Sequence, residues 1–165
     1  MNILVTGAKG FVGKNLCAAL KNIRDGKDRT RPELTIGEIF EYDIDTDPAL
    51  LDEYCAKADF VFNLAGVNRP QNPEEFMQGN FGFASTLLDS LKKHNNNCHI
   101  MISSSIQATC IGRYDGDYGR SKKAGEELVF AYGEEIGAKV LVYRFPNLFG
   151  KWCRPNYNSA VATFC

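Results

Sequence analysis

Asn2-Ile-Leu-Val-Thr-Gly7-Ala-Lys-Gly10-Phe-Val-Gly13 is the stretch that decides the fold of this chain. Its first five residues predict a short buried strand, and the residues after the last glycine predict a helix. In a turn of this kind, Gly7 permits the tight bend, Gly10 lets a pyrophosphate approach the backbone, and Gly13 lets the helix pack closely on the strand. The helix start would offer free N–H groups to the phosphates, so the segment predicts a dinucleotide-binding loop. A glycine-rich turn without a ligand is the alternative.

Apolar and helical segments alternate along the rest of the chain. Helix starts are indicated by Asp47 before Pro48 and by Asn72 before Pro73, and Gly137 indicates a helix end. We expect strands at 3–6, 38–42, 60–64, 100–103 and 140–143, helices at 11–22, 48–56, 73–94 and 118–136, and a solvated loop at 24–36. This order predicts an α/β fold with a doubly wound parallel sheet, a Rossmann fold, whose ligands gather at the carboxyl ends of the strands.

A second motif, Tyr118-Gly-Arg-Ser-Lys122, follows the serine cluster Ser103-Ser104-Ser105. Residues four apart share one face of a helix, so Tyr118 and Lys122 would point the same way. A nearby ammonium would lower the pKa of Tyr118 from its usual value near ~10. Such a phenol can exchange a proton with an alcohol or carbonyl oxygen, which a serine hydroxyl can also hydrogen-bond. The motif indicates hydride transfer at a carbinol carbon, although the spacing alone also fits a surface helix.

The composition excludes several other classes of protein. With 165 residues and a formal net charge of −1, the chain can bury a sizeable core and indicates no nucleic-acid or membrane partner. Its six cysteines contain no Cys-x-x-Cys pair, so we expect free thiols and no metal site. Neither a signal peptide nor an apolar segment of ~20 residues is visible, which favours a cytoplasmic location.

The motifs together resemble a known family, the extended short-chain dehydrogenases/reductases of the nucleotide-sugar epimerase/dehydratase type. The resemblance covers nearly the whole chain in the family's order. It lies in Thr6-Gly-Ala-Lys-Gly-Phe-Val-Gly13, Asp59-Phe-Val-Phe-Asn-Leu-Ala-Gly66, Asn80-Phe-Gly-Phe-Ala-Ser-Thr-Leu-Leu88, Ser103-Ser-Ser105, Tyr118-x-x-x-Lys122 and Tyr143-Arg-Phe-Pro-Asn-Leu-Phe-Gly150.

A narrower resemblance, to capsular-polysaccharide reductases of the CapF/WbjC type, lies in three segments. They are Ala65-Gly-Val-Asn-Arg-Pro70, Ser103-Ser-Ser-Ile-Gln-Ala-Thr109 and Pro146-Asn-Leu-Phe-Gly-Lys-Trp-Cys-Arg-Pro-Asn-Tyr-Asn-Ser159. That resemblance implies NADPH-dependent reduction of a UDP-4-keto-6-deoxy-N-acetylhexosamine to UDP-N-acetyl-6-deoxytalosamine, on the way to surface polysaccharide. Members of the family also carry a C-terminal cupin domain, which this sequence does not contain.

The resemblance implies roles for individual residues. Tyr118 would donate a proton to the sugar C4 oxygen, Lys122 would lower its pKa and hold the nicotinamide ribose, and Ser105 would supply the catalytic hydroxyl, with Ser104 as the alternative. The cofactor contacts would be Gly7, Lys9, Gly10, Phe11, Val12, Gly13, Asp43, Leu64, Ala65, Gly66, Asn80, Ser103, Lys122 and Pro146. The substrate contacts would be Asn68, Arg69, Ser105, Asn147 and Arg154. A simple turn at Asn68-Arg69 and a solvated Arg154 remain alternatives, and Trp152 is expected to pack rather than stack on a ligand.

The resemblance favours NADP(H), whose 2′-phosphate Lys9 or an arginine within 24–31 would bind. Asp43, at the end of the second expected strand, instead resembles the acid that binds a ribose 2′-hydroxyl, so NAD(H) is possible.

We expect residues 1–150 to form the dinucleotide-binding domain and 151–165 to begin the substrate-binding region, the rest of which the sequence lacks. A UDP-sugar partner and a homo-oligomer are also expected. Two alternatives to a reductase stay open: a nucleotide-sugar 4-epimerase and a non-catalytic dinucleotide-binding fragment. Dehydratases of the family place an acid pair after the serine or threonine, and Ile106-Gln107 at that place argues against dehydration.

Overall fold

A computed structural model describes residues 1–68, 70–157 and 159–164 of the chain. The strands are β1 (Ile3–Thr6), β2 (Ile39–Tyr42), β3 (Phe60–Asn63), β4 (His99–Ser105) and β5 (Val140–Phe145). The helices are α1 (Phe11–Arg24), α2 (Pro48–Lys57), α3 (Glu74–Phe76), the π-helix η1 (Met77–Gly82), α4 (Phe83–Lys93), the 3-10 helices η2 (Ile106–Thr109) and η3 (Gly112–Tyr114), α5 (Asp117–Ile136) and α6 (Ala160–Phe164).

The five strands form one parallel sheet in the order β2-β1-β3-β4-β5. The chain therefore moves outward from β1 in one direction to β2 and in the other direction to β3, β4 and β5. Ligands of doubly wound sheets bind where this order reverses, outside the carboxyl ends of the strands. The reversal lies between β1 and β3, so the loops after these two strands border the expected binding position.

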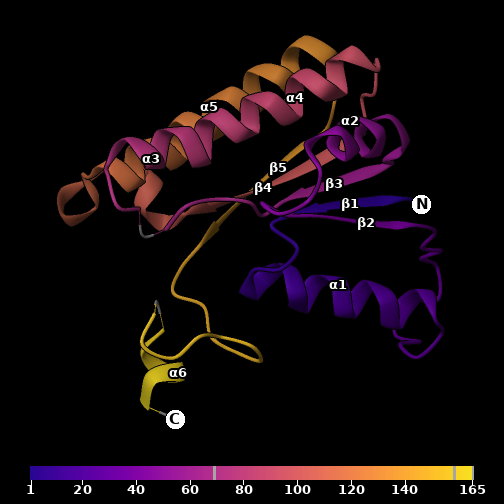
Figure 1. The fold of residues 1–165 in the computed structure, drawn as a ribbon, viewed down its shortest axis with the longest axis horizontal. Helices are drawn as coiled ribbons and strands as arrows, with labels where there is room; N and C mark the ends of the chain where they lie inside the picture. Colours follow the sequence, from indigo (N-terminus) through magenta and orange to yellow (C-terminus); the bar gives the residue numbers. More distant parts are fainter. Residues whose placement is uncertain (69, 158, 165) are drawn as a thin grey trace.

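The helices cover the two faces of the sheet unequally (Figure 1). Helix α1 lies alone on one face, while α2, α4 and α5 lie on the other. The larger core lies beneath those three helices and includes Leu4, Val61, Leu87, Ile100 and Val129. The smaller core lies beneath α1 and includes Ile3, Val5, Cys17 and Leu20. The doubly wound α/β fold expected from the sequence is confirmed.

The segment expected as one helix over 73–94 contains three different helical parts. A short α3 leads into the π-helix η1, and a regular helix resumes only in α4. A π segment widens the turn by one residue and is frequent at functional sites. The side chain of Asn72 does not cap this helix, which has Pro73 at the N-cap position without a side-chain hydrogen bond. The periodicity of apolar residues did not show this interruption, because apolar positions continue on both sides of it.

The other expected helix ends are confirmed. The carboxylate of Asp47 accepts a hydrogen bond from the Ala49 amide at the start of α2. Gly137 ends α5 with a φ of 75°, a left-handed conformation that glycine adopts without strain.

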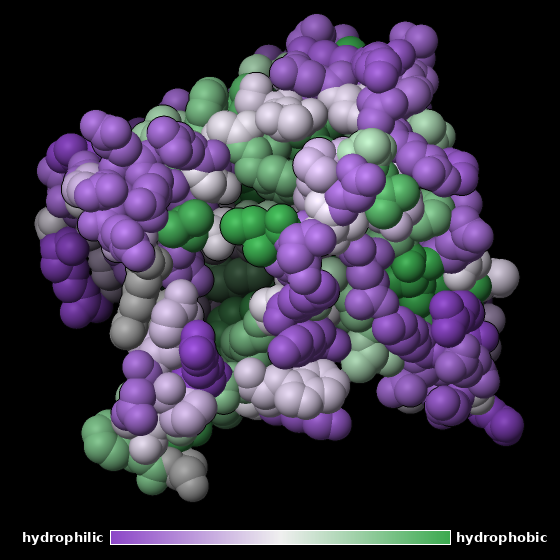
Figure 2. Space-filling model, viewed as in Figure 1, coloured by the Kyte–Doolittle hydropathy of each residue, from purple (hydrophilic) through white to green (hydrophobic). Residues whose placement is uncertain are grey.

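The segment after β5 returns beneath the sheet toward the start of α1. The Asn15 side chain of α1 donates a hydrogen bond to the Lys151 carbonyl at 2.7 Å, which fixes the segment there. This segment then ends in α6, which lies apart from the sheet in Figure 1. Figure 2, viewed from the same side as Figure 1, shows a hollow in this face of the molecule, with hydrophobic residues around it.

Two further findings concern the described residues only. Their five cysteines are free, with burial raising the pKa of Cys17 and Cys55 to about 11 and that of Cys98 to about 12. Across residues 1–68, 70–157 and 159–164, no helix is long and apolar enough to cross a membrane.

Candidate dinucleotide and catalytic site

A cleft of about 1440 Å³ opens at the carboxyl ends of the strands. It gathers nearly all of the residues that the sequence indicated as cofactor, substrate or catalytic contacts. Those that line it are Gly7, Lys9, Gly10, Phe11, Val12, Gly13, Asp43, Leu64, Ala65, Gly66, Asn68, Ser103, Ser104, Ser105, Tyr118, Lys122, Pro146, Asn147 and Arg154. Asn80 is buried behind the cleft, and Arg69 lies outside the described residues.

The glycine loop has no room for a side chain at two of its glycines. Gly7 has a φ of 68°, and a Cβ there would lie 2.7 Å from the Ala65 amide nitrogen in the loop after β3. At Gly13, a Cβ would lie 2.2 Å from the Gly7 carbonyl oxygen, so only glycine lets α1 start this close to β1. Helix α1 begins after Gly10 without a side-chain cap, which leaves its first amides directed at the cleft.

Asp43 lies at the tip of β2 with its carboxylate fixed by backbone groups. One carboxylate oxygen accepts a hydrogen bond from the Lys9 amide at 2.7 Å, and the other accepts one from the Ile44 amide at 2.9 Å. The Lys9 ammonium is paired with Asp45. The carboxylates of Asp43 and Asp45, the second of them paired with the Lys9 ammonium, therefore lie beside the position that a ribose next to the glycine loop would take.

The arginines of the loop after α1 lie elsewhere. Arg24 is the last residue of α1 and pairs with Asp25. Because α1 has 14 residues, its two ends are separated by ~20 Å. The expectation that an arginine within 24–31 could reach a 2′-phosphate is therefore wrong, since this loop lies at the amino ends of the strands (Figure 1), whereas the cleft is lined by residues at their carboxyl ends.

Lys122 is nearly buried, with 8% of its surface exposed. Its ammonium donates a hydrogen bond to the Ser103 carbonyl at 3.2 Å and lies 5.8 Å from the centre of the Tyr118 ring. Burial lowers the pKa of Lys122 to about 8. At pH 7 the amine is still mostly protonated. Within the described part of the chain it donates this one hydrogen bond, so two of its three N–H groups can donate to a ligand in the cleft.

The expected lowering of the Tyr118 pKa is wrong. Burial raises the pKa of this phenol, and a hydrogen bond with Ser105 only partly opposes the rise. The physical reason is that the ring lies against Phe76, 5.5 Å between ring centres, where a phenolate would lose its hydration. Tyr118 is therefore a protonated phenol at neutral pH, the form that a proton donor requires.

The three serines at the end of β4 have different partners. The Ser105 hydroxyl accepts a hydrogen bond from the Gln107 amide and is the one that reaches Tyr118. The Ser104 hydroxyl instead donates to the buried carboxylate of Glu126. Ser104, the alternative catalytic hydroxyl, is thus already engaged, which leaves Ser105 as the serine beside the phenol.

Asn80 joins two walls of the site from within the π-helix η1. Its side chain exchanges hydrogen bonds with the Val67 backbone, at 3.0 and 3.2 Å, and donates to the Ser121 hydroxyl at 3.0 Å. Ser121 in turn donates to the Tyr118 carbonyl at 2.8 Å. Asn80 therefore braces the loop after β3 against the start of α5.

Several residues that line the cleft were not indicated by the sequence as site residues. They include Gln107, Arg113, Tyr114 and Tyr157. Trp152 was expected to pack, but 47% of its surface is exposed and it lines the cleft, with the Lys151 ammonium 4.3 Å from its ring. A φ of 66° at Trp152 turns the segment there, and neither motif nor periodicity signals such a turn.

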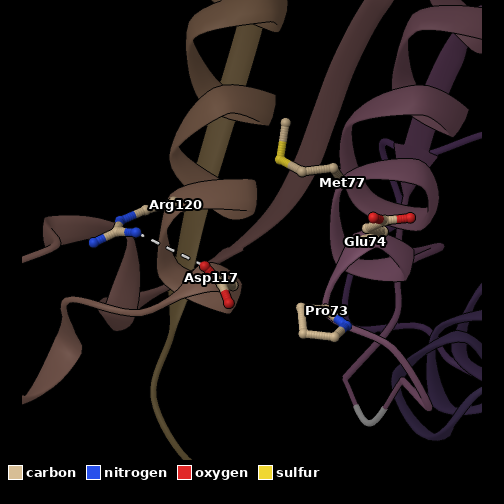
Figure 3. A pocket seen from close by; sticks show the side chains of 5 residues that line it. All are labelled: Pro73, Glu74, Met77, Asp117 and Arg120. Atoms are coloured by element: carbon tan, nitrogen blue, oxygen red, sulfur yellow. Dashed lines mark ion pairs between the residues drawn. The ribbon is translucent and has the colours of Figure 1, made fainter.

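A smaller hollow of about 290 Å³ lies between α3 and the start of α5 (Figure 3). Pro73, Glu74, Met77, Asp117 and Arg120 line it. Arg120 pairs with both Asp115 and Asp117, so the hollow presents no unpaired charge from this arginine. Among the described residues, no group of three His, Cys, Asp or Glu side chains is placed to hold a metal ion.

Comparison with known proteins agrees with this geometry. The model of the NAD dependent epimerase/dehydratase family matches residues 3–164. The chain belongs to this family. Within the family it is 45% identical to UDP-2-acetamido-2,6-beta-L-arabino-hexul-4-ose reductase of Pseudomonas aeruginosa, over 100% of this chain and 40% of that protein. It is 30% identical to UDP-glucuronate 4-epimerase 3 of Arabidopsis thaliana, over 94% of this chain and 44% of that protein.

The solved structures include the capsular polysaccharide assembling protein CapF from Staphylococcus aureus. It superimposes on this chain with a TM-score of 0.79 at 48% identity, covering 100% of this chain and 41% of CapF. The chain spans about 40% of the length of these relatives.

Proposed function

We propose that this chain is the dinucleotide-binding and catalytic part of a reductase that acts on a UDP-linked 4-keto-6-deoxy-N-acetylhexosamine. The observation that carries the proposal is the convergence of Tyr118, Lys122 and Ser105 at one edge of a cleft whose other edge is the glycine loop. The similarity to a reductase of such a UDP-ketose in Pseudomonas aeruginosa supports this substrate class.

The residues of the cleft fit a nicotinamide dinucleotide. The glycine loop has no room for side chains at Gly7 and Gly13, and the uncapped start of α1 faces the space beside it. A pyrophosphate accepts hydrogen bonds from such amides. When bound, the nicotinamide supplies the hydride that reduces the sugar carbonyl carbon.

The chain's own residues would manage the proton and the developing charge. Tyr118, protonated and buried, would donate its proton to the carbonyl oxygen as that oxygen gains charge. Ser105 would donate a hydrogen bond to the same oxygen and fix its position. The Lys122 ammonium, held by the Ser103 carbonyl, would bind ribose hydroxyls and stabilise the phenolate left on Tyr118.

We propose NAD(H) as the preferred cofactor, although the resemblance to the CapF type favours NADP(H). The fixed carboxylate of Asp43 can accept hydrogen bonds from ribose hydroxyls but would repel a 2′-phosphate. Asp45 adds a second negative charge nearby and occupies the Lys9 ammonium.

We propose residues 1–150 as the dinucleotide-binding unit and 151–165 as the beginning of the substrate-binding region. Trp152, Arg154 and Tyr157 line the same cleft from this segment, beyond the catalytic edge, which supports a role in holding the sugar nucleotide. The homo-oligomer and the cytoplasmic location remain predictions.

The proposal is tested by following NADH and NADPH absorbance when the native protein is mixed with a UDP-4-keto-6-deoxy-N-acetylhexosamine. A reductase consumes the reduced cofactor in proportion to product, and deuterium from labelled cofactor appears at the sugar C4. A nucleotide-sugar 4-epimerase is the second candidate because of the UDP-glucuronate 4-epimerase relative. It would instead interconvert C4-epimeric UDP-hexoses, which carry a C4 hydroxyl, without net cofactor consumption. Loss of water from a UDP-hexose that keeps its C6 hydroxyl, with no reduction of the 4-keto-6-deoxy sugar, would indicate a dehydratase and would contradict the proposal.

A further inference from the structure

An ionic contact with a buried carboxylate lies one helical turn beyond Lys122 on α5. Glu126 has 4% of its surface exposed, and Arg144 of β5 donates two hydrogen bonds to its carboxylate, at 2.8 Å from Nε and 2.6 Å from Nη2. The Ser104 hydroxyl of β4 donates a third. One carboxylate therefore joins α5, β4 and β5.

This contact is not an efficient way to stabilise a fold. Burial alone would raise the pKa of Glu126, but the hydrogen bonds from Arg144 and Ser104 lower it, so the carboxylate stays charged. A carboxylate that is buried in this way loses its hydration, and an ion pair repays that loss only when its geometry is very good. What a paired, fork-shaped contact adds is a fixed orientation of the elements that it joins.

The orientation that it fixes is that of the catalytic edge. Ser104 is the middle residue of the serine cluster, at the end of β4. Because the backbone joins it directly to Ser103 and Ser105, the hydrogen bond to Glu126 also holds these two neighbours close to α5. The Ser103 carbonyl receives the Lys122 ammonium, and the Ser105 hydroxyl meets Tyr118.

Arg144 fixes a second part of the cleft. It precedes Phe145 and Pro146, which both line the cleft where β5 ends. The guanidinium is about half exposed, so it holds the buried carboxylate from the rim of the sheet.

We propose that Glu126 and Arg144 are positioning residues for Lys122, an inference that rests on the proposed function. They hold α5 in register with the ends of β4 and β5, so that the ammonium stays buried against the Ser103 carbonyl. Neither residue lines the cleft among those that the structure describes, so both act through the lysine rather than on a ligand.

The test compares Glu126→Gln with Glu127→Gln, a matched change at the exposed next position of the same helix. In the native protein, Glu126→Gln should lower kcat by roughly 10-fold or more, because small misplacements of catalytic groups are costly, while KM changes little. Loosening the helix should also hydrate Lys122, so its titration, followed by NMR of ¹³C-methylated lysine, should move from about 8 upward. Glu127→Gln should leave kcat and the titration unchanged.

Arg144→Lys provides a second variant that keeps the charge and loses the two-pronged contact. It should shift the Lys122 titration in the same direction by a smaller amount, and it decides the matter if Glu126→Gln does not fold. Folded variants with a normal Lys122 titration and a normal kcat would overturn the proposal, even if their melting temperatures fell. If the wild-type protein reduces no UDP-ketose, the proposed function fails, whereas the lysine titration still tests the positioning.

Discussion

The ammonium of Lys122 lies 5.8 Å from the centre of the Tyr118 ring, one turn further along α5. The two groups share a buried edge of the cleft. Burial raises the pKa of Tyr118 and lowers the pKa of Lys122, so it favours the uncharged form of each side chain. The lysine is thus held at a cost in stability, and the tyrosine is a protonated phenol at neutral pH.

Replacing Lys122 with methionine should stabilise the fold at neutral pH. The pKa of this lysine falls from 10.5 in the unfolded chain to about 8 in the fold, which costs roughly 3 kcal/mol below pH 8. Methionine removes that cost and loses one hydrogen bond to the Ser103 carbonyl, worth about 1 kcal/mol. Denaturant unfolding at pH 7 should therefore show a gain on the order of 2 kcal/mol.

The sign of the pH dependence provides the control. Between about pH 8 and 10.5 the unfolded state binds more protons than the fold, so the stability of the wild type rises with pH there. The advantage of Lys122→Met should shrink across that window. Lys123→Met, at the exposed neighbouring position, should show no such trend. A Lys122→Met variant that is less stable than the wild type at pH 7 would contradict the conclusion that burial of Lys122 destabilises the fold.

Gly10→Val should abolish dinucleotide binding without unfolding the chain. A Cβ at Gly10 would lie 3.2 Å from the Gly7 carbonyl oxygen, a contact that a small shift relieves, while the methyl groups would fill the space at the start of α1. Calorimetry should show affinity lowered by roughly 100-fold or more, since the pyrophosphate loses its close approach to the backbone. Gly116→Ala, where a Cβ meets no atom within 4 Å, is the matched control.

Asp43→Asn should weaken the proposed preference for NADH over NADPH. Removing one negative charge reduces the repulsion of a 2′-phosphate, and we expect the ratio of the two dissociation constants to change by about 10-fold. Glu41→Gln, on the same strand but paired with Lys21, should leave the ratio unchanged. A wild type that already binds NADPH more tightly would refute the role given to Asp43.

The sequence predicted the features that local chemistry determines. The glycine loop, Asp47 at its helix cap and Gly137 at a helix end each follow from what a single residue can do, and the structure has them as expected. The cleft residues from separate loops could also be anticipated, because parallel strands bring their carboxyl ends to one edge.

Other features depend on contacts between distant segments. The pKa of Tyr118 is set by its burial beside Phe76, which spacing along α5 does not reveal. The hydrogen bond from Ser104 to Glu126 depends on which face of β4 packs on α5. Three identical residues in a row do not reveal which of their side chains lies on that face. The π-helix around Asn80 is likewise invisible in apolar periodicity, although it places the side chain that braces the site.

The most direct test of the account is the turnover of Tyr118→Phe in the native protein with a UDP-4-keto sugar. The variant lacks only the phenolic hydroxyl, and with it the proton to be donated, so kcat should fall by on the order of 10²–10⁴-fold, the usual contribution of a positioned acid. Dinucleotide affinity should be unchanged, and Tyr114→Phe, another tyrosine of the cleft, should retain normal turnover. A Tyr118→Phe variant with near-normal kcat would contradict the proton donation from which the proposed function is derived.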